Sequence, residues 1–540
     1  MQAVIQNWTV RKPAARSRYG IVAAQHEGAA RIGAEALAAG GSAVDAALAT
    51  AFALAAVEPW NSGLGGIGFM VVQPAGAVRA EVVDFGPVAP RGLDPADYPL
   101  TGETATELFT WARVRDDRNM HGPLSFAVPG AVRGYGLAHR RFGRLPWREL
   151  VMPAVRLAEA GLPVDWWVTV KTASAAADLR RYEESRRIWL PDGLPPHCPA
   201  NGEPPRLRLG PLAETLERLA TCGAEDFYTG EIAQAIAADA RAGGGSLSAA
   251  DLAQCQARIV PALDIPYRGV TMQAARGLTA APTLADVLGR LAGQRFGPAP
   301  DAAYFEAVIA ALQQAYAARL SGLGDTGLGD TGLGDTGLGD TGLGDTGRDG
   351  ETCTTHITAV DRDGGIAALT TTLLSSFGSR YVLPRTGILM NNGVMWFDPQ
   401  PGRPNSLGPG KRALTNMCPV IVARDGRGWF GAGASGGRRI MGSVLQLASF
   451  VIDFGMSAEE AGHHPRVDVS GEHGAAIDCR MPREILDRLT ARCGADIVEH
   501  AAWPNRFSCP NLVLRDTDGT HHGISDVMSP WSAAIAEPGR

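Results

Sequence analysis

Residues 354–372 alternate between polar and apolar positions in the manner of a β-hairpin. One face of the first strand carries Thr354, His356, Thr358 and Val360, and the other carries Thr355, Ile357 and Ala359. Turn-forming residues fill 361–365, and a second β-branched and aliphatic run fills 366–372. If Val360 pairs with Ile366, Thr354 lies opposite Thr372, and a slip of one residue would turn every side chain to the other face. The pattern therefore predicts a hairpin in which these two threonines face each other.

The segment before this hairpin repeats Gly-Leu-Gly-Asp-Thr five times over residues 322–346. It has too little apolar surface to fold alone, so we expect a flexible linker over 320–353. Calcium-binding β-rolls also use Gly and Asp, but with a period of about nine residues, and we favour the linker. A flexible tract that leads directly into a Thr-Thr strand is typical of a self-cleaving precursor. A cut before Thr354 would free an α-amino group that can serve as base for its own hydroxyl.

Several further elements follow from the same kind of pattern. Residues 21–24 predict a short strand, and a helix is expected from about 27 to the stop signal at Gly40-Gly41. Ser42 and Asp45 have the spacing of a capping box before an all-apolar, buried helix over 43–57.

The run Gly63-Leu-Gly-Gly-Ile-Gly68 has the spacing of a dinucleotide-binding loop. Such a loop needs the order strand, turn, helix, whereas the order here is helix, turn and then a strand at 69–72. We favour a glycine turn packed near a catalytic centre.

The pattern after residue 165 predicts helices on the outside and strands within. Residues 165–310 are expected to form a mostly helical outer layer. Buried strands are expected at 387–392, 417–422 and 429–432, and a helix from about 439. Strands covered by helices on both sides indicate a layered α/β sandwich.

Five motifs carry a resemblance that covers nearly the whole chain. They lie at 40–59, 62–69, 354–356, 408–412 and 433–440. With these motifs the chain resembles the γ-glutamyltransferase family of N-terminal nucleophile hydrolases. The resemblance implies an α/β fold of the four-layer αββα type, built from two subunits, 1–353 and 354–540, that stay associated after autocleavage.

The resemblance also implies the roles of four residues. Thr354 would be the nucleophile, Thr372 would orient its hydroxyl, and Gly436 and Gly437 would form the oxyanion hole. Without the resemblance, the threonines could be an ordinary stabilising cross-strand pair and the glycines a tight turn. His356 is expected to be structural.

The chain departs from the family where the acyl donor is held. The arginine that grips the donor's α-carboxylate is absent, since its position reads Gly86. Leu374 replaces an asparagine, Trp396 replaces the acidic residue that holds the α-ammonium, and Thr415-Asn416 replaces a Ser-Ser pair. Arg91 is a candidate substitute for the arginine.

These departures favour a donor without the ammonium, because a charge buried without its partner is costly. Glutaryl is glutamyl without its amine, so the cephalosporin acylase branch of the family fits best, with glutaryl or γ-glutamyl amides as donors and water or an amine as acceptor. An ordinary γ-glutamyltransferase acting on glutathione, and an unprocessed non-catalytic binding protein, remain alternatives.

Composition limits the remaining possibilities. A net charge of −6 gives no reason to expect nucleic acid or anionic membrane as partner. The eight cysteines form no Cys-x-x-Cys pair, so neither a metal nor any other cofactor is expected. The longest apolar run, 46–57, is too short to cross a bilayer. No secretory signal is evident near the start, and a cytoplasmic enzyme is therefore expected.

Overall fold

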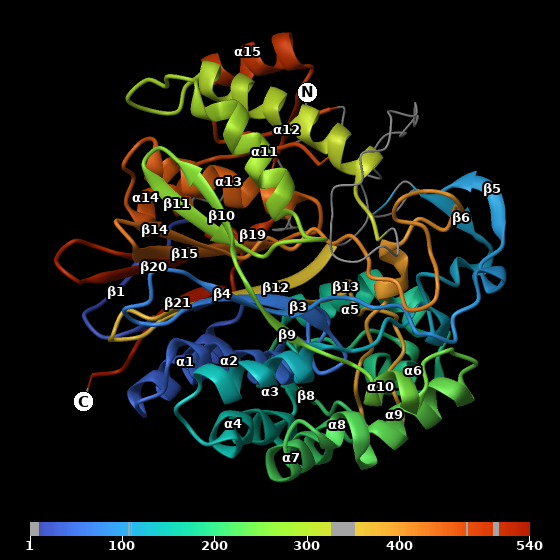
Figure 1. Ribbon diagram of the computed structural model, residues 1–540. Coiled ribbons are helices and arrows are strands. Elements are labelled where there is room, and N and C mark those ends of the chain that lie inside the picture. Colours follow the sequence, from blue (N-terminus) through green and yellow to red (C-terminus); the bar gives the residue numbers. More distant parts are fainter. Residues whose placement is uncertain are drawn as a thin grey trace.

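The computed structural model describes residues 10–105, 109, 111–325, 352–470, 474–499 and 507–539. Two seven-stranded antiparallel sheets face each other at the centre, and helices cover the outer face of each (Figure 1). This arrangement confirms the four-layer αββα sandwich. In the described part of the chain, no helix combines the length and the apolar character that a membrane crossing requires.

The first sheet contains the hairpin, and we call it the hairpin sheet. Its strands, in spatial order, are β21 (Ala533–Ala536), β2 (Ile21–Ala24), β12 (Thr352–Val360), β13 (Ile366–Ser375), β3 (Ile67–Gln73), β4 (Glu81–Phe85) and β9 (Arg258–Pro261). The facing sheet has the order β1 (Ala15–Ser17), β20 (His521–Ser525), β19 (Cys509–Arg515), β15 (Arg427–Ser435), β14 (Val420–Arg424), β11 (Val270–Ala274) and β10 (Leu263–Tyr267).

Helices from the first part of the chain cover the hairpin sheet. They are α1 (Glu27–Ala38), α2 (Ala43–Val57), α3 (Ala131–Phe142), α4 (Trp147–Ala160), α5 (Trp166–Leu179), α6 (Glu183–Trp189), α7 (Leu212–Cys222), α8 (Asp226–Thr229), α9 (Glu231–Ala242) and α10 (Ala249–Ala253). The facing sheet is covered by α11 (Ala281–Ala292), α12 (Ala302–Gly322), α13 (Arg439–Ile452), α14 (Ala458–His463) and α15 (Arg483–Cys493) (Figure 1). Short strands lie at the periphery: β5 (Leu100–Thr104), β6 (Ala112–Val114), β7 (Leu162–Pro163), β8 (Arg206–Leu207), β16 (Val467–Asp468), β17 (Ala476–Asp478) and β18 (Asp496–Val498).

The capping box before α2 is confirmed. The Asp45 amide donates to Ser42 Oγ at 3.1 Å, and the Ser42 amide donates back to the Asp45 carboxylate at 2.8 Å. All of α2 is buried, as its apolar pattern predicts, so this helix is the central support under the hairpin. The glycine turn after it leads into β3, in the order helix, turn, strand.

The register of the hairpin is confirmed from Thr355 to Val360, which pair with Thr371 and Ile366 at the two ends. Before Thr355 the register shifts by one residue, because Cys353 pairs with Leu374. Between these two pairs, Thr354 of β12 lies opposite both Thr372 and Leu373 of β13, so β13 carries the extra residue of a β-bulge, a feature that re-aims a side chain. The simple pairing of Thr354 with Thr372 is replaced by a bulge that the alternation did not reveal.

One predicted element is incomplete and another is wrong. The segment 165–310 is mostly helical, as predicted, but strands β9, β10 and β11 also lie within it and extend both sheets. Residues 387–392 form no strand: isolated bridges at Leu389 and Met390 are followed by a short 3₁₀ helix, Gly393–Trp396. Side-chain hydrogen bonds replace the backbone hydrogen bonds of a strand there. The side-chain amide of Asn391, for example, donates to the Gly65 carbonyl at 2.7 Å.

The expected linker over 320–353 is wrong at both of its ends. Helix α12 continues to Gly322 and β12 begins at Thr352. Residues 326–351, which include most of the repeat, lie outside the described residues. The last residue described before that gap, Asp325, accepts a hydrogen bond from the Arg412 amide at 2.8 Å.

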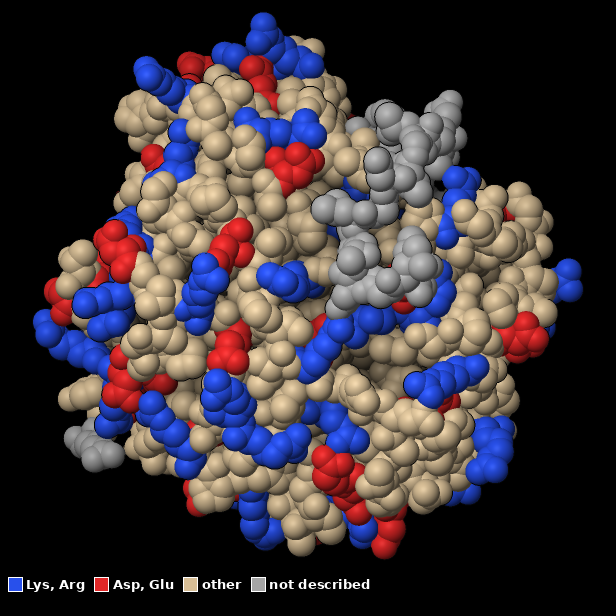
Figure 2. All heavy atoms as spheres, in the orientation of Figure 1, with Lys and Arg blue, Asp and Glu red and all other residues tan. Residues whose placement is uncertain are grey.

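The surface carries charges of both signs. On the face drawn in Figure 2, basic and acidic side chains are interspersed over the same elements. Within the described ranges, no group of three or more His, Cys, Asp and Glu side chains is placed to hold a metal ion.

Candidate active site

The structure brings the two predicted threonines together at the bulge. The Thr354 hydroxyl lies 3.1 Å from the Thr372 hydroxyl, and it also contacts the carbonyl oxygen of Cys353. The Thr372 hydroxyl donates to the same carbonyl at 2.6 Å and accepts from the Leu374 amide at 2.8 Å. Both threonines are buried. Thr372 therefore contacts both the Thr354 hydroxyl and the peptide bond that precedes Thr354.

The residues on either side of Thr354 are held by the turn that follows α2, residues 58–62, which we call the flank turn. The Cys353 thiol donates to the Asn61 side-chain oxygen at 3.1 Å, and the Thr355 hydroxyl donates to the Glu58 carboxylate at 3.4 Å. Ser62 donates to the Thr355 hydroxyl at 3.2 Å. The flank turn thus fixes both sides of the bulge, which sequence reasoning missed.

Glu58 is a buried acid within this turn. Burial raises the pKa of its carboxyl to about 7, although hydrogen bonds from Asn61 and Thr355 and the charge of Lys171 act in the opposite direction. Burial thus favours the neutral acid, whereas the hydrogen bonds that Asn61 and Thr355 donate to Glu58 favour the ionised carboxylate. The Ser-x-x-Asp and Glu-Pro ends of α2 were visible in the sequence, but the contact with the hairpin was not.

His356 is a structural residue, as expected. Its ring lies between Thr370, at 2.8 Å from Nδ1, and Thr358, at 3.0 Å from Nε2. Complete burial lowers the pKa of this imidazole to about 3, so it is neutral at physiological pH. The ring occupies the space beside Gly433 of the facing sheet, where a Cβ would lie 2.2 Å from it.

The two glycines predicted as the oxyanion hole lie between β15 and α13. Gly436 has φ +136° and Gly437 has φ +58°, conformations that L-residues rarely adopt. Their carbonyls accept from Arg439 and Ile440, so the first turn of α13 is built on them. A Cβ on Gly436 would lie 2.6 Å from Ser508.

Gln25 ties the glycine turn to the hairpin. Its amide nitrogen donates to Ser435 Oγ at 2.8 Å, and its oxygen accepts from the His356 amide at 3.2 Å. Gly436 follows Ser435 directly and Thr354 lies two residues before His356, so this side chain links the two halves of the site. No pattern in the sequence marks Gln25 for this role.

The predicted substitutions on the donor side lie in one apolar cluster, which we call the donor wall. It contains Leu374, Met395, Trp396, Ala413 and Met417. Leu374 adopts φ +88°, an unusual conformation for a leucine, within the strand that also carries Thr372. The Trp396 indole nitrogen is buried without a hydrogen-bond partner among the described residues. An acidic side chain in this cluster would be surrounded by apolar atoms.

The structure also explains why no side chain stands at Gly86. A Cβ there would lie 2.6 Å from the Phe69 ring and 3.1 Å from the Arg412 guanidinium. Arg412 is paired with Asp84 through contacts of 2.6 and 2.9 Å. Phe69 and the ion pair therefore fill the space that a side chain at this position would need.

Of the other residues predicted to bind the acyl donor, Thr415 and Asn416 are buried, whereas Arg91 lies at the surface. The Thr415 hydroxyl donates to the Leu278 carbonyl at 3.1 Å, and the Asn416 side-chain oxygen accepts from Arg319 at 3.4 Å. Arg91 is exposed, and its backbone amide donates to Asp251. No contact among the described residues joins Arg91 to the threonine pair.

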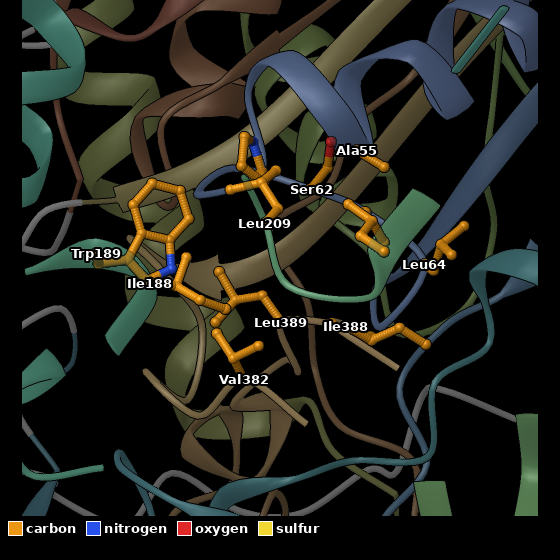
Figure 3. A pocket seen from close by; sticks show the side chains of 13 residues that line it. Ala55, Ser62, Leu64, Ile188, Trp189, Leu209, Val382, Ile388 and Leu389 are labelled. Atoms are coloured by element: carbon orange, nitrogen blue, oxygen red, sulfur yellow. The ribbon is translucent and has the colours of Figure 1, made fainter. Parts of the chain in front are cut away.

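A separate apolar pocket lies beside the flank turn, which contributes Pro59 and Ser62 to its lining (Figure 3). It encloses about 370 Å³, counting its open mouth, and is lined by Ala55, Pro59, Ser62, Gly63, Leu64, Ile188, Trp189, Leu209, Leu212, Val382, Gly387, Ile388 and Leu389. Neither Thr354 nor Thr372 lines it, so it is distinct from the space in which a donor would meet the nucleophile.

The layered fold is that of the N-terminal nucleophile hydrolases. The chain superposes on a cephalosporin acylase from Bacillus halodurans with a TM-score of 0.84 at 23% identity, covering 100% of this chain and 99% of the other. The sequence model described as gamma-glutamyltranspeptidase matches residues 29–331 and 343–536. The chain belongs to the gamma-glutamyltranspeptidase family.

Two relatives represent two branches of that family. The chain is 32% identical over 537 residues to the acylase ACY 1 proenzyme of Pseudomonas sp. (strain V22), covering 95% of this chain and 93% of the relative. It is 30% identical over 489 residues to the glutathione hydrolase proenzyme of Escherichia coli (strain K12), covering 84% and 81%. Family membership therefore indicates an enzyme of the hydrolase and acyltransferase type.

Proposed function

We propose that the chain is a precursor that cleaves itself between Cys353 and Thr354 and then acts on amides through an acyl ester of Thr354. The observation that carries this proposal is the position of Thr372, whose hydroxyl contacts both the Thr354 hydroxyl and the Cys353 carbonyl. The proenzyme names of the relatives are consistent with it.

The cleavage begins when Thr354 Oγ attacks the carbonyl carbon of Cys353. The hydroxyl proton goes to the departing nitrogen, which becomes the α-amino group of Thr354, and water hydrolyses the resulting ester. Negative charge develops on the Cys353 carbonyl oxygen, to which Thr372 already donates. A donor placed there before the reaction stabilises the transition state without reorganisation.

In each later turnover the freed α-amino group takes the proton from Thr354 Oγ as it attacks the donor carbonyl. The amides of Gly436 and Gly437 stabilise the oxyanion, and the leaving amine takes the proton. Water or an acceptor amine then resolves the ester. This assignment gives the large subunit residues 1–353 and the small subunit residues 354–540.

The donor is a glutaryl or γ-glutamyl amide, with glutaryl preferred. The support for this preference is the donor wall, where Leu374 and Trp396 present apolar surface instead of a partner for an ammonium group. The 30% identity to a glutathione hydrolase supports an ordinary γ-glutamyl enzyme as the second candidate. The intact threonine pair argues against a non-catalytic binding protein.

N-terminal sequencing of the purified protein tests the cleavage. The smaller fragment should begin Thr-Thr-His, and mass spectrometry after brief incubation with a donor should find the acyl group on that fragment. Thr354→Ala should remain uncut and lose at least about 10³-fold in activity, whereas Thr354→Ser, which keeps a hydroxyl, should still be cut. A full-length wild-type chain that is active would contradict the proposal.

A further inference from the structure

Two buried arginines lie beside the glycine turn without a carboxylate partner. Arg319 is on α12 and Arg438 directly follows Gly437, and they are 3% and 5% exposed. Burial lowers the pKa of both guanidinium groups to about 10, and the charge of Arg438 contributes to the lowering at Arg319, so the two lie close together. No ion pair joins either of them to an Asp or Glu in the described part of the chain. Buried cations are normally paired.

Arg319 has a structural explanation. Its guanidinium donates to the Thr279 carbonyl at 2.7 Å and to the Thr283 hydroxyl at 3.2 Å, and it also contacts the Thr415 carbonyl and the Asn416 side chain. These contacts fix the segment that carries Thr415 and Asn416, so Arg319 is satisfied by backbone and side-chain oxygens.

Arg438 has no such explanation. Its Nη2 is buried and has no hydrogen-bond partner among the described residues. The guanidinium lies 5.2 Å from the centre of the Phe109 ring and 5.9 Å from that of Trp111. Ring faces attract a cation, but they accept none of the in-plane N–H groups. The side chain is therefore held in place, and the N–H groups of Nη2 remain available to donate hydrogen bonds to another molecule.

The chemistry of the free N–H groups of Arg438 indicates which ligand would bind there. A guanidinium binds a carboxylate through parallel charge-assisted hydrogen bonds, and the low dielectric of a buried site strengthens them. Arg438 lies next to the predicted oxyanion glycines and, through Arg319, next to Thr415 and Asn416. A donor whose reacting carbonyl meets Gly436 would have its other end near these residues.

We propose that Arg438 binds the distal carboxylate of the acyl donor and replaces the arginine missing at Gly86. This inference rests on the proposed function, because it assumes an acyl group that ends in a carboxylate. It assigns the specificity for that carboxylate to the start of α13, instead of to Arg91 or the segment around Gly86.

A matched pair of donors tests the assignment. One is a glutaryl amide, and the other has the same leaving group but a carboxamide in place of the distal carboxylate. Arg438→Gln should lower kcat/KM for the glutaryl amide by about 30-fold, mainly through KM, in keeping with the loss of a charge-assisted pair. The carboxamide donor should change less than about threefold. Arg438→Lys, which keeps the charge, should restore part of the loss.

Arg439→Gln is the matched control, because it makes the same charge change one residue along. Arg439 faces Asp468 at 3.7 Å and should leave the ratio between the two donors unchanged. Equal losses on both donors in Arg438→Gln, or the same shift of the ratio in Arg439→Gln, would overturn the inference and leave Arg438 with a structural role.

Calorimetric titration with glutarate separates this inference from the proposed function. Wild-type protein should bind glutarate, and Arg438→Gln should bind it at least about tenfold more weakly, with an unchanged melting temperature. If glutarate binds in this way but neither donor is turned over, the proposed function fails and the carboxylate site stands. If both donors react and glutarate binds equally to the two proteins, the carboxylate site fails alone.

Discussion

The polar face of the hairpin and the donor wall are adjacent regions built on opposite principles. The hydroxyls of Thr354 and Thr372 and the ring of His356 are all hydrogen-bonded to neighbours on the same sheet. In the donor wall, Leu374 and Trp396 bury apolar surface, and the Trp396 indole nitrogen has no hydrogen-bond partner among the described residues. The network holds the threonines that the family resemblance predicts, whereas the wall holds residues at which the sequence was expected to depart from the family.

We infer that the polar network determines the chemical step and that the donor wall determines which acyl donor is preferred. Changes in the polar network should affect every donor equally, because each donor passes through the same acyl ester. Changes in the donor wall should alter the ratio between donors and leave self-cleavage intact.

The largest effect is expected at the glycine turn. Gly436→Ala should lower kcat by about 10²- to 10³-fold for all donors alike, because the new methyl group would collide with Ser508 and displace the oxyanion amides. Gly442→Ala within α13 is the control, since a Cβ there meets only Leu312 at 3.6 Å, an ordinary contact. Steady-state kinetics with two donors would measure both variants, and a donor-selective loss in Gly436→Ala would break the distinction.

The stability of the polar network should depend on pH. Because burial depresses the pKa of His356 to about 3, the folded state excludes the proton that the unfolded chain binds near pH 6.5. The stability contributed by neutral His356 is present above pH 6.5 and is lost as the pH falls towards 3. Urea unfolding of the uncut Thr354→Ala chain should show a loss of a few kcal/mol between about pH 6.5 and 4.

Four other histidines contribute with the same sign, since burial lowers the pKa of His26 and His464, that of His121 to about 3 and that of His521 to about 4. Carbon-13 labelling of the histidines isolates His356, whose resonance should stay that of a neutral ring down to about pH 4. A His356 resonance that titrates near pH 6.5 would mean that the polar network is open to water.

A smaller effect is expected at the flank turn. Glu58→Gln should slow self-cleavage by about tenfold, because the amide nitrogen that replaces one carboxylate oxygen donates hydrogen bonds and cannot accept one from Thr355 or Asn61. In the wild type, cleavage should slow as the pH falls through about 7 and Glu58 takes up a proton. Pulse-labelled precursor sampled over time would give the rates. Glu58→Asp should recover part of the rate, and equal rates in Glu58→Gln and wild type would remove the flank turn from the account.

Other charged or titratable groups surround Glu58 and could share the pH dependence. They are Lys171 on α5, the Cys353 thiol on β12 and the Cys509 thiol on β19. A pH profile that persists in Glu58→Gln would therefore point to one of these groups instead.

The sequence predicted the regular parts of the hairpin and of α2 because their patterns are local. Alternation and turn residues gave the register from Thr355 to Val360, and Ser42 with Asp45 gave the start of α2. Strands β9 and β10 were missed because each contains a proline, which normally argues against a strand. Both are edge strands, where a missing amide donor is tolerated.

Contacts between distant segments could not be predicted in this way. The bulge at Thr354 depends on the flank turn, almost 300 residues earlier in the chain. In the folded chain, no Asp or Glu among the described residues pairs with Arg438, and its Nη2 has no hydrogen-bond partner there. Only the folded structure can show this. In the sequence it is one of two adjacent arginines in a family motif, with nothing to mark it as the buried one.

The ratio of kcat/KM for a glutaryl amide to that for the matching γ-glutamyl amide tests the central claim most directly. The account predicts a ratio above about ten in the wild type, because the donor wall leaves an ammonium without a partner. Trp396→Asp, which supplies a carboxylate, should lower that ratio at least about tenfold and leave cleavage at Thr354 unchanged. A wild type that prefers the γ-glutamyl amide by tenfold or more would contradict the account.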